Sequence, residues 1–277
     1  MFSIQSILSL ALKSGNLTSL EAEVLLAHVL IVARSYLRAW HEKTMTEQQK
    51  QAFESLVSRR CVGEPLAYLI GRKEFWSLPL VVSNSVLIPR PETECLVELV
   101  LNKFNNASGS LSVLDLGTGS GAIALALGVE RPRWKIIGID RSIAALEIAE
   151  LNAKNNGISN VEFMQSDWFM CFESGKTRFD IIVGNPPYIH PTDSHLEGEI
   201  RYEPKEALIS LPDGLQDLKK IIRETSDYLA PQGWLFVEHG FDQDVFVRKT
   251  MELADFSDVQ TYKDLADINR VTVGRKR

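Results

Sequence analysis

The sequence of 277 residues predicts an α/β protein in which helices cover both faces of a mostly parallel sheet, with a small helical domain before it. Three observations lead to this prediction. From residue 111 onward, short β-branched segments alternate with helical patterns, as they do in parallel sheets. A glycine-rich turn joins the first of these segments to the following helix. The first seventy residues show helical spacing and helix-capping signals instead.

These first seventy residues predict a small helical bundle. Thr18-Ser-Leu-Glu21 and Thr46-Glu-Gln-Gln49 are capping-box patterns, in which the first and fourth side chains bond free amides at a helix start. Helical spacing after the first box places four apolar residues on one face, namely Leu20, Val24, Ala27 and Ile31. We expect residues 1–73 to form a helical domain that recognises a partner, with a purely structural bundle as the alternative.

Residues 74–90 differ in character and predict a β-hairpin that links two domains. The segments Phe75–Val82 and Ser85–Pro89 are short and rich in β-branched or aromatic residues, and Ser83-Asn84 stands between them as a turn. A proline-rich break then leads into a helix that is predicted over residues 92–104.

Residues 91–277 are expected to form the α/β domain. Strands are predicted near 111–115, 135–140, 161–166, 179–184, 233–238, 257–262 and 270–275. Further helices are predicted near 120–130, 142–156, 213–229 and 243–254. The connection between the last two strands is short enough for a hairpin, which permits an antiparallel last strand.

Charge and cysteine content limit the classes of partner and compartment. Residues 1–90 hold ten Lys or Arg and seven Asp or Glu, a net charge of +3, whereas residues 91–277 hold twenty and twenty-nine, a net charge of −9. General binding of nucleic acid phosphates is therefore not expected. The three cysteines, Cys61, Cys95 and Cys171, show no disulfide or zinc-finger spacing. With no basic leader and no apolar run long enough to span a bilayer, we expect a cytoplasmic protein without membrane contact.

The run Leu111-Ser-Val-Leu-Asp-Leu-Gly-Thr-Gly-Ser-Gly121 predicts a strand, a glycine-rich turn and the start of a helix. Glycines allow the backbone to turn tightly and a ligand to approach it closely. The second strand ends in Asp140, 23 positions after Gly117, where a carboxylate can accept both hydroxyls of a ribose. The candidate nucleoside-binding loop is Gly117, Thr118, Gly119, Ser120 and Gly121. The alternative is a tight packing turn with a helix-capping Asp140.

The spacing of the glycines distinguishes between nucleoside cofactors. Dinucleotide-binding loops carry GxGxxG and bind a pyrophosphate, whereas this loop is GxGxG and follows Asp115. A carboxylate there would repel a pyrophosphate but could contact an ammonium or sulfonium group, so we expect S-adenosylmethionine as the cofactor. After the third strand, Asp167 could accept a hydrogen bond from the adenine amine while Trp168 packs on the ring. The same pair also fits a turn with a core tryptophan.

A rigid corner follows the fourth strand. The apolar run Asp180-Ile-Ile-Val-Gly184 must end before Pro186 and Pro187, because prolines lack amide donors and restrict φ. Open α/β sheets place their chemistry at such carboxyl ends of strands. Asn185 offers a planar carboxamide and Tyr188 an aromatic face, a pair that suits a flat, neutral –NH2 group. Asn-Pro-Pro-Tyr is also an ordinary turn sequence.

Together, the glycine loop, Asp140, Asp167-Trp168 and Asn185-Pro-Pro-Tyr188 resemble class I (Rossmann-like) methyltransferases that modify planar nitrogens. Five further runs are similar to the peptide chain release factor glutamine methyltransferases, the PrmC/HemK family. They are Gly63-Glu-Pro-Leu-Ala-Tyr68, Gly71-Arg-Lys-Glu-Phe-Trp76, Leu87-Ile-Pro-Arg-Pro-Glu-Thr-Glu94, Glu203-Pro-Lys-Glu-Ala-Leu208 and Arg270-Val-Thr. The resemblance extends from about residue 18 to the end. Asp267 departs from it, since the family often has glycine there.

The resemblance implies that the substrate is the glutamine of the Gly-Gly-Gln motif in translation release factors, methylated on its side-chain nitrogen N5. It also implies that the helical domain helps to grip the release factor. Asn185 cannot act as a base at neutral pH, but its side-chain oxygen and the backbone carbonyl of Pro186 can accept both N–H bonds of a substrate amide, with Tyr188 stacked on the amide plane. The candidate catalytic residues are Asn185, Pro186, Pro187 and Tyr188.

Other functions are weighed against this one. An adenine- or guanine-amino methyltransferase that acts on DNA or RNA would use the same acceptor pair, but it predicts a basic groove, which the net charge of residues 91–277 opposes. The GxGxG spacing disfavours a nicotinamide-dependent oxidoreductase. The intact corner at residues 185–188 disfavours a non-catalytic adaptor.

The segment after this corner holds two further groups of polar residues. His190, Asp193 and His195 lack the fixed geometry of a ligand set, so we expect no metal there. The charged residues of the following run predict either a lid over the substrate or a solvated segment; they are Glu197, Glu199, Arg201 and Glu203. We expect the protein to be a monomer.

Overall fold

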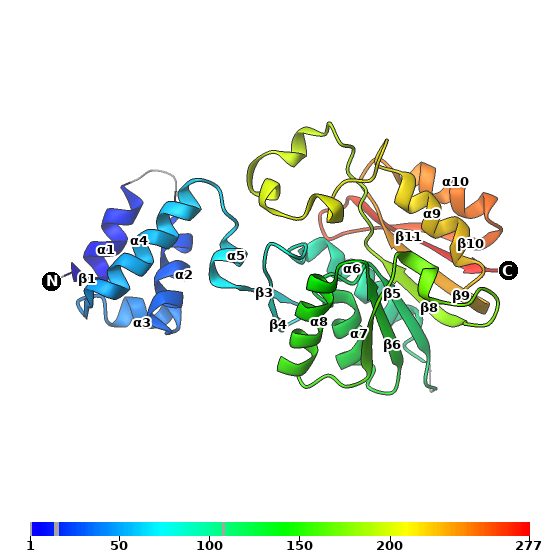
Figure 1. Ribbon diagram of the computed structural model, residues 1–277, viewed down its shortest axis with the longest axis horizontal. Coiled ribbons are helices and arrows are strands. Elements are labelled where there is room, and N and C mark those ends of the chain that lie inside the picture. The colour runs from blue at the N-terminus through cyan, green and yellow to red at the C-terminus, as the bar shows by residue number, and fades with distance from the viewer. Residues whose placement is uncertain (1, 14–16, 107–108) are drawn as a thin grey trace. The chain divides into compact units, whose positions relative to one another are not determined.

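The computed structural model describes residues 2–13, 17–106 and 109–277, and the chain divides into two compact units (Figure 1). The helical unit consists of the chain up to Arg72 together with Glu197–Tyr202. The second unit, which the sequence predicts to carry the catalytic site and which we therefore call the catalytic unit, consists of Lys73–Leu196 and Glu203–Arg277. Nothing in the sequence patterns indicated that residues 197–202 would belong to the helical unit. None of the helices in the described part of the chain has the length and hydropathy needed to span a bilayer.

The helical unit contains five α-helices and a two-residue antiparallel strand pair among the residues described. They are α1 (Ile4–Leu12), α2 (Ser19–Leu30), α3 (Arg34–Ala39), α4 (Glu47–Cys61) and α5 (Leu66–Ile70), with β1 (Phe2–Ser3) and β2 (Thr44–Met45). Both predicted capping boxes are present, so the starts of α2 and α4 are confirmed. In the first box, the amide of Thr18 donates to Glu21 Oε2 at 2.8 Å, and the amide of Glu21 donates to Thr18 Oγ1 at 3.3 Å.

The predicted apolar face of α2 is confirmed only in part, since Ala27 is buried but Leu20 and Ile31 are not. The structure buries Ala22, Leu25, Leu26 and Ala27, whereas Leu20 is 53% exposed and Ile31 is 92% exposed. Ile31 follows the helix as its left-handed C-cap with φ of 55°, which carries its side chain off the helical spacing. The helix also contacts α1, α3, α4 and α5, so its buried band is set by several partners at once and not by one apolar stripe.

The hairpin is present, but its turn lies earlier than the sequence predicts. Strands β3 (Arg72–Phe75) and β4 (Leu78–Val81) pair around Trp76 and Ser77, whose φ angles are 50° and 60°. Two positive φ angles are typical of a tight hairpin turn that normally selects Asn or Gly, which explains why the sequence did not reveal it. Tertiary contacts hold it: the amide of Trp76 donates to Glu94 at 2.9 Å and its indole donates to Glu130 at 2.9 Å. The predicted strand at residues 85–89 does not form.

The catalytic unit is built on a seven-stranded sheet in the order β10-β11-β9-β8-β5-β6-β7. The strands are β5 (Ser112–Leu116), β6 (Lys135–Asp140), β7 (Val161–Gln165), β8 (Phe179–Gly184), β9 (Leu229–Glu238), β10 (Phe256–Lys263) and β11 (Asn269–Lys276). Strands β5 to β9 are mutually parallel and β11 is antiparallel to both of its neighbours, which confirms the predicted sheet. Strand β9 begins four residues before its predicted start at 233, because a register shift opposite β8 accommodates Pro231.

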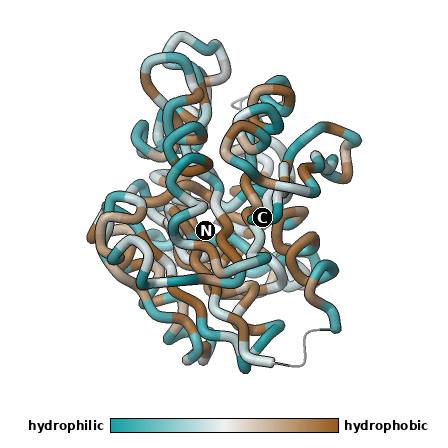
Figure 2. Tube along the Cα trace, turned by 90° about the vertical axis from the view of Figure 1, so that its right-hand side faces the viewer, coloured by the Kyte–Doolittle hydropathy of each residue, from teal (hydrophilic) through white to brown (hydrophobic). Residues whose placement is uncertain are grey.

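Helices cover both faces of this sheet (Figure 1). The α-helices are α6 (Glu94–Lys103), α7 (Ala122–Glu130), α8 (Ile143–Asn155), α9 (Gln216–Thr225) and α10 (Asp244–Leu253). Short 3-10 turns are η1 (Pro91–Thr93), η2 (Trp168–Cys171), η3 (Ser194–Leu196), η4 (Gly198–Tyr202) and η5 (Lys205–Ala207). Val113 of β5 joins the apolar cluster of α6 and α7, whereas its neighbour Leu114 joins that of α9 and α10. The apolar stretches that form these clusters are brown in Figure 2.

The strand order places the carboxyl ends of β5 and β8 side by side. The chain runs from β5 outward through β6 and β7, then returns to β8 on the other side of β5. Leu116 therefore pairs in register with Gly184, and a Cβ added at Gly184 would lie 3.2 Å from the Cβ of Leu116. This reversal of strand order is where open α/β sheets bind ligands.

Candidate active site

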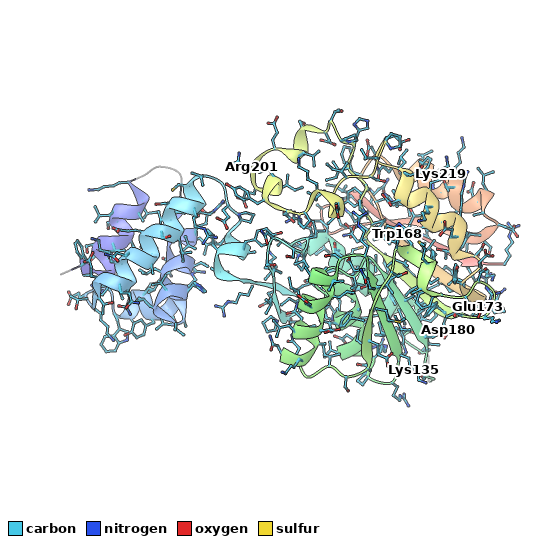
Figure 3. The ribbon with its side chains drawn as sticks, viewed as in Figure 1. Lys135, Trp168, Glu173, Asp180, Arg201 and Lys219 are labelled. Carbon is cyan, nitrogen blue, oxygen red and sulfur yellow. The ribbon has the colours of Figure 1, made fainter. Side chains whose placement is uncertain are left out.

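A cavity opens at this edge of the sheet, within the catalytic unit. Its lining includes seven of the predicted site residues, namely Gly117, Gly119, Asp140, Asp167, Trp168, Asn185 and Pro187. Six others do not line it: Asp115, Thr118, Ser120, Gly121, Pro186 and Tyr188. Figure 3 shows Trp168 at this edge, whereas Lys135 lies at the other end of the strands, where β6 begins.

The glycine loop turns through three left-handed residues. The φ angles of Gly117, Gly119 and Gly121 are 69°, 55° and 84°, which only glycine adopts without strain. Gly121 is also packed closely, since an added Cβ would lie 3.1 Å from Leu125 and 3.2 Å from Ala149. The amide of Thr118 donates to the carbonyl of Ile139 at 2.8 Å. Gly117 and Gly119 line the cavity, whereas Thr118 is held by its hydrogen bond to Ile139 and Gly121 by close packing.

Asp115 lies behind this loop and is fully buried. Its Oδ2 accepts hydrogen bonds from Thr118 Oγ1 at 2.7 Å and from the amide of Ala124 at 3.2 Å, in the first turn of α7. Burial raises the pKa of Asp115 to about 7. Its other oxygen is buried and accepts no hydrogen bond from the described residues. The geometry makes Asp115 a support for the loop, and it does not place the carboxylate on the cavity wall.

Asp140 fixes the loop from the end of β6 and still faces the cavity. Its Oδ2 accepts from the amide of Gly119 at 3.0 Å, and its Oδ1 accepts from the amide of Ser142 at 2.9 Å. A carboxylate oxygen has more than one acceptor position. Asp140 can therefore hold the loop and accept hydroxyl groups from a ligand in the cavity.

Asp167 and Trp168 form another wall after β7. A Cβ added at Gly117 would lie 3.6 Å from the Trp168 ring. A side chain at position 117 would therefore narrow the space between the loop and this ring. Trp168 itself has φ of 49°. Asp167 is 54% exposed and pairs with Lys220 of α9 at 3.2 Å. Lys220 is a charged neighbour that the sequence patterns did not indicate.

Asn185 stands at the carboxyl end of β8, and its side chain has a defined orientation. Its Nδ2 donates a hydrogen bond to Thr93 Oγ1 at 3.2 Å, and Thr93 is buried in η1. Its Oδ1 accepts no hydrogen bond from the described residues, so this oxygen is available to a ligand. Pro187 also lines the cavity, while Pro186 lies between two lining residues.

Tyr188 points into the protein and does not line the cavity. Its hydroxyl donates to Glu238 Oε1 at 3.3 Å, and its ring packs against the apolar cluster that contains α9 and α10. Burial raises the pKa of the Tyr188 phenol. The amide of Ile189 donates to the carbonyl of Leu208 at 2.9 Å, and Gln243 donates to the carbonyl of Tyr188 at 2.8 Å. The corner is thus held from several elements.

The structure adds residues that the sequence interpretation did not assign to the site. Glu238, at the end of β9, is buried, and burial raises its pKa to about 7, while the hydroxyl of Thr93 and the charge of Arg270 lower it. Two features of the sequence could have indicated these residues. Glu238 is an acid at the end of an apolar strand, and Thr93 and Arg270 stand in runs that resemble the family. Glu203 accepts from the amide of Ile88 at 3.0 Å and pairs with Arg90, so it supports the cavity wall at residues 85–87.

The charged run after the corner is divided between the two units, and its residues Glu197, Glu199 and Arg201 are exposed, as the solvated-segment alternative expects. Glu199 pairs with Arg60 inside the helical unit, and Arg201 donates to the carbonyl of Val62 at 2.5 Å. Glu203 is buried in the catalytic unit. Among the described residues, no group of three or more His, Cys, Asp or Glu could hold a metal ion, and the side chain of His195 lies outside that description.

Comparisons with known proteins match both units of the chain. The family model of the PrmC N-terminal domain matches residues 8–71, and that of a methyltransferase domain matches residues 107–271. A release factor glutamine methyltransferase of Aliivibrio fischeri is 47% identical over 98% of this chain and 95% of its own length. The Escherichia coli enzyme of the same description is 45% identical over 92% of this chain and 91% of its own.

A solved structure shares the fold. The crystal structure of a methyltransferase from Pyrococcus furiosus, 18% identical, covers 79% of this chain and 96% of its own with a TM-score of 0.54. The two family models together span both units of the chain. With these models matched and relatives this similar over nearly its whole length, the chain belongs to the release factor glutamine methyltransferase family.

Proposed function

We propose that this protein transfers the methyl group of S-adenosylmethionine to the side-chain nitrogen N5 of the glutamine in the Gly-Gly-Gln motif of translation release factors. One observation carries the proposal. A single cavity is lined by Gly117 and Gly119 of the glycine loop, by Asp140 and by Asn185, at the point where strand order reverses. Cofactor and substrate groups would therefore meet at adjacent strand ends.

The residues of the cavity fit the cofactor. The Asp140 carboxylate would accept the ribose hydroxyls, Trp168 would pack on the adenine, and Asp167 would accept from the adenine amine. The backbone of Gly117 and Gly119 permits close approach, and the acidic surroundings disfavour a pyrophosphate. The bound cofactor supplies a methyl group that a sulfonium already activates. Asp115 would shape the loop from behind and make no direct contact.

The chemical contribution of the protein is alignment. An amide nitrogen is a poor nucleophile, because its lone pair is shared with the carbonyl, so holding it in line with the methyl group supplies much of the rate. Asn185 Oδ1 and the Pro186 carbonyl would accept the two N–H bonds and stabilise positive charge as it develops on nitrogen. This pair selects against a carboxylate, which has no N–H to offer. Tyr188 would support the corner. Its ring would stack on the substrate amide only if the Tyr188 hydroxyl gave up its hydrogen bond to Glu238.

The helical domain at residues 1–73 would recognise the release factor. Large apolar side chains are exposed on it, which is typical of protein-binding surfaces. They include Leu20, Ile31, Trp40 and Val62. The acidic balance of residues 91–277 supports a protein substrate over a nucleic acid. Because release factors act in translation, the enzyme would work in the cytoplasm, and we expect it to do so as a monomer.

Radiolabel transfer tests this function. Purified protein is incubated with methyl-labelled S-adenosylmethionine and a release factor, beside the same factor with Gly-Gly-Gln changed to Gly-Gly-Glu, and beside tRNA, rRNA and DNA. Label is expected on the unchanged factor alone. Transfer to a nucleic acid, or equal label on the Gly-Gly-Glu factor, would contradict the proposal.

A further inference from the structure

Asp217 lines the cavity, although no sequence pattern assigned it to the site. It lies in the first turn of α9, where acidic side chains commonly bond free backbone amides. In the described part of the chain, however, no amide of α9 donates to this carboxylate; its protein partner is the hydroxyl of Ser210. Helix capping therefore does not account for the acid in the cavity wall.

Ser210 holds one oxygen of this carboxylate. The serine is fully buried. Its Oγ donates to Asp217 Oδ2 at 2.6 Å and accepts from the amide of Asp217 at 2.9 Å. A serine hydroxyl has a single proton, so this proton points to Oδ2. The other oxygen, Oδ1, has no hydrogen-bond or ion-pair partner among the described residues, which leaves its acceptor positions for a ligand.

The serine is fixed in turn to the corner that carries Asn185. The amide of Ser210 donates to the carbonyl of Ile189 at 3.2 Å. The amide of Ile189 donates to the carbonyl of Leu208 at 2.9 Å. Asp217 and the corner therefore belong to one hydrogen-bonded body, and the carboxylate keeps a set place in the cavity wall.

The same face of α9 reaches the wall formed by Asp167 and Trp168. Lys220 stands three residues after Asp217, and residues three apart are neighbours on a helix surface. Its Nζ bonds Asp167 Oδ1 at 3.2 Å. In Figure 3, α9 is marked by Lys219 and this wall by Trp168. The adenine amine, which Asp167 would accept in the proposed function, has two N–H bonds. Because Lys220 already occupies one oxygen of Asp167, the amine needs a second acceptor nearby.

We propose that Asp217 is a specificity-determining residue, whose Oδ1 accepts the second N–H bond of the adenine amine beside Asp167. This inference rests on the proposed function, in which the base of S-adenosylmethionine packs on Trp168. Two carboxylates then recognise a donor at the edge of the base. The cavity therefore selects adenine over hypoxanthine, whose carbonyl oxygen at that position would face acceptors and leave them unpaired.

The test measures binding of S-adenosylhomocysteine and S-inosylhomocysteine to the full-length enzyme by isothermal titration calorimetry. These analogues carry adenine and hypoxanthine, and neither transfers a methyl group. Wild type should bind the adenine analogue at least about tenfold more tightly, the effect of one unpaired polar group. In Asp217→Asn, the Ser210 proton selects the carboxamide oxygen, so the NH2 group takes the place of Oδ1. The ratio of the two Kd values should shift toward hypoxanthine about 100-fold, because the amine meets a donor and the carbonyl gains one.

The ratio is taken on one protein sample, so an unfolded fraction of Asp217→Asn lowers the number of sites but not the ratio. The control is Asp242→Asn, an exposed acid that does not line the cavity, which should keep the wild-type ratio. An unchanged ratio in Asp217→Asn would overturn the inference, even if KM for the release factor rose, since Asp217 would then serve the substrate. Failure of the wild type to bind S-adenosylhomocysteine would instead contradict the proposed function.

Discussion

The backbone amide of Gly119 donates a hydrogen bond of 3.0 Å to Asp140, so the glycine loop after β5 and the acid that ends β6 are held as one piece. Two segments that lie apart in the sequence thereby share one side of the cavity. The loop does not depend on the ligand for its shape, because Thr118, Asp115 and Asp140 already fix it. A cofactor would bind to a largely preformed surface.

Replacing Asp140 should therefore weaken cofactor binding. Asp140→Ala removes the carboxylate from both the loop and the ribose hydroxyls, and hydrogen bonds to a charged group contribute roughly 1.5–3 kcal/mol, so Kd for S-adenosylmethionine should rise about 10- to 100-fold. Isothermal titration calorimetry measures it. The matched control is Asp267→Ala, whose side chain is 84% exposed and pairs only with Lys263 in the ion pairs of the described residues. Unchanged Kd in Asp140→Ala would contradict the assignment.

Gly121 should be the glycine of the loop with the largest effect on stability. Gly121→Ala places a Cβ 3.1 Å from Leu125 and 3.2 Å from Ala149 at φ of 84°, so strain and overpacking together should lower the free energy of unfolding by about 2–4 kcal/mol. Gly175→Ala is the control, because its φ of 79° is similar and no atom lies within 4 Å of the added Cβ. Its cost should be about 1 kcal/mol. Equal losses in denaturant titrations would show that packing at Gly121 is unimportant.

Asp115 should make the stability of the catalytic unit depend on pH. Its folded pKa is raised to about 7 from an ordinary value near 4, because burial penalises the charged form. The folded state then binds the proton more tightly than the unfolded state, so the stabilisation is present below pH 4 and is lost as pH rises to 7. Asp115→Asn keeps an acceptor but cannot titrate. The variant should gain stability relative to wild type between pH 5 and 8, measured by urea unfolding; a constant difference would contradict the shift.

Arg60 should hold residues 197–202 within the helical unit. Its guanidinium bonds Glu21 at 2.6 and 2.8 Å and also pairs with Glu199. Arg60→Gln removes the charge, and a loss of about 1 kcal/mol should speed amide exchange in residues 197–202 about fivefold. Arg59→Gln is the control, because Arg59 pairs with Glu64 and is 51% exposed. Hydrogen exchange that changes equally in both variants would rule out this anchor.

Much of the catalytic fold could be predicted from local patterns. Apolar β-branched runs located β6 and β8 at their observed bounds, and the alternation of strands and helices gave the parallel sheet. The site residues at strand ends followed from the same reasoning, since parallel strands bring their carboxyl ends to one edge. Gly117, Asp140, Trp168 and Asn185 accordingly lie around one cavity.

What the sequence could not reveal depends on partners distant in the chain. The hairpin turn at Trp76 is held by Glu94 and Glu130, and a local rule that looks for Asn or Gly misses it. Residues 85–87 look like a strand but line the cavity instead. The hydrogen bond from Asn185 to Thr93 joins a residue that precedes β5 in the sequence to one that follows β8, and no sequence pattern predicts it. Asp115 was expected to contact the cofactor; the structure buries it behind the loop, outside the cavity lining, and the contact itself stays a prediction.

The central claim is that Asn185 holds the substrate nitrogen, and the variant Asn185→Ala tests it most directly. Methyl transfer to a release factor is measured at saturating cofactor, together with the cofactor Kd, and with the exposed Asn102→Ala as control. We predict that Asn185→Ala lowers kcat about 100-fold or more, as for loss of a group that stabilises developing charge, while the cofactor Kd stays within about twofold and Asn102→Ala behaves as wild type. Turnover in Asn185→Ala equal to that of the wild type would contradict the account.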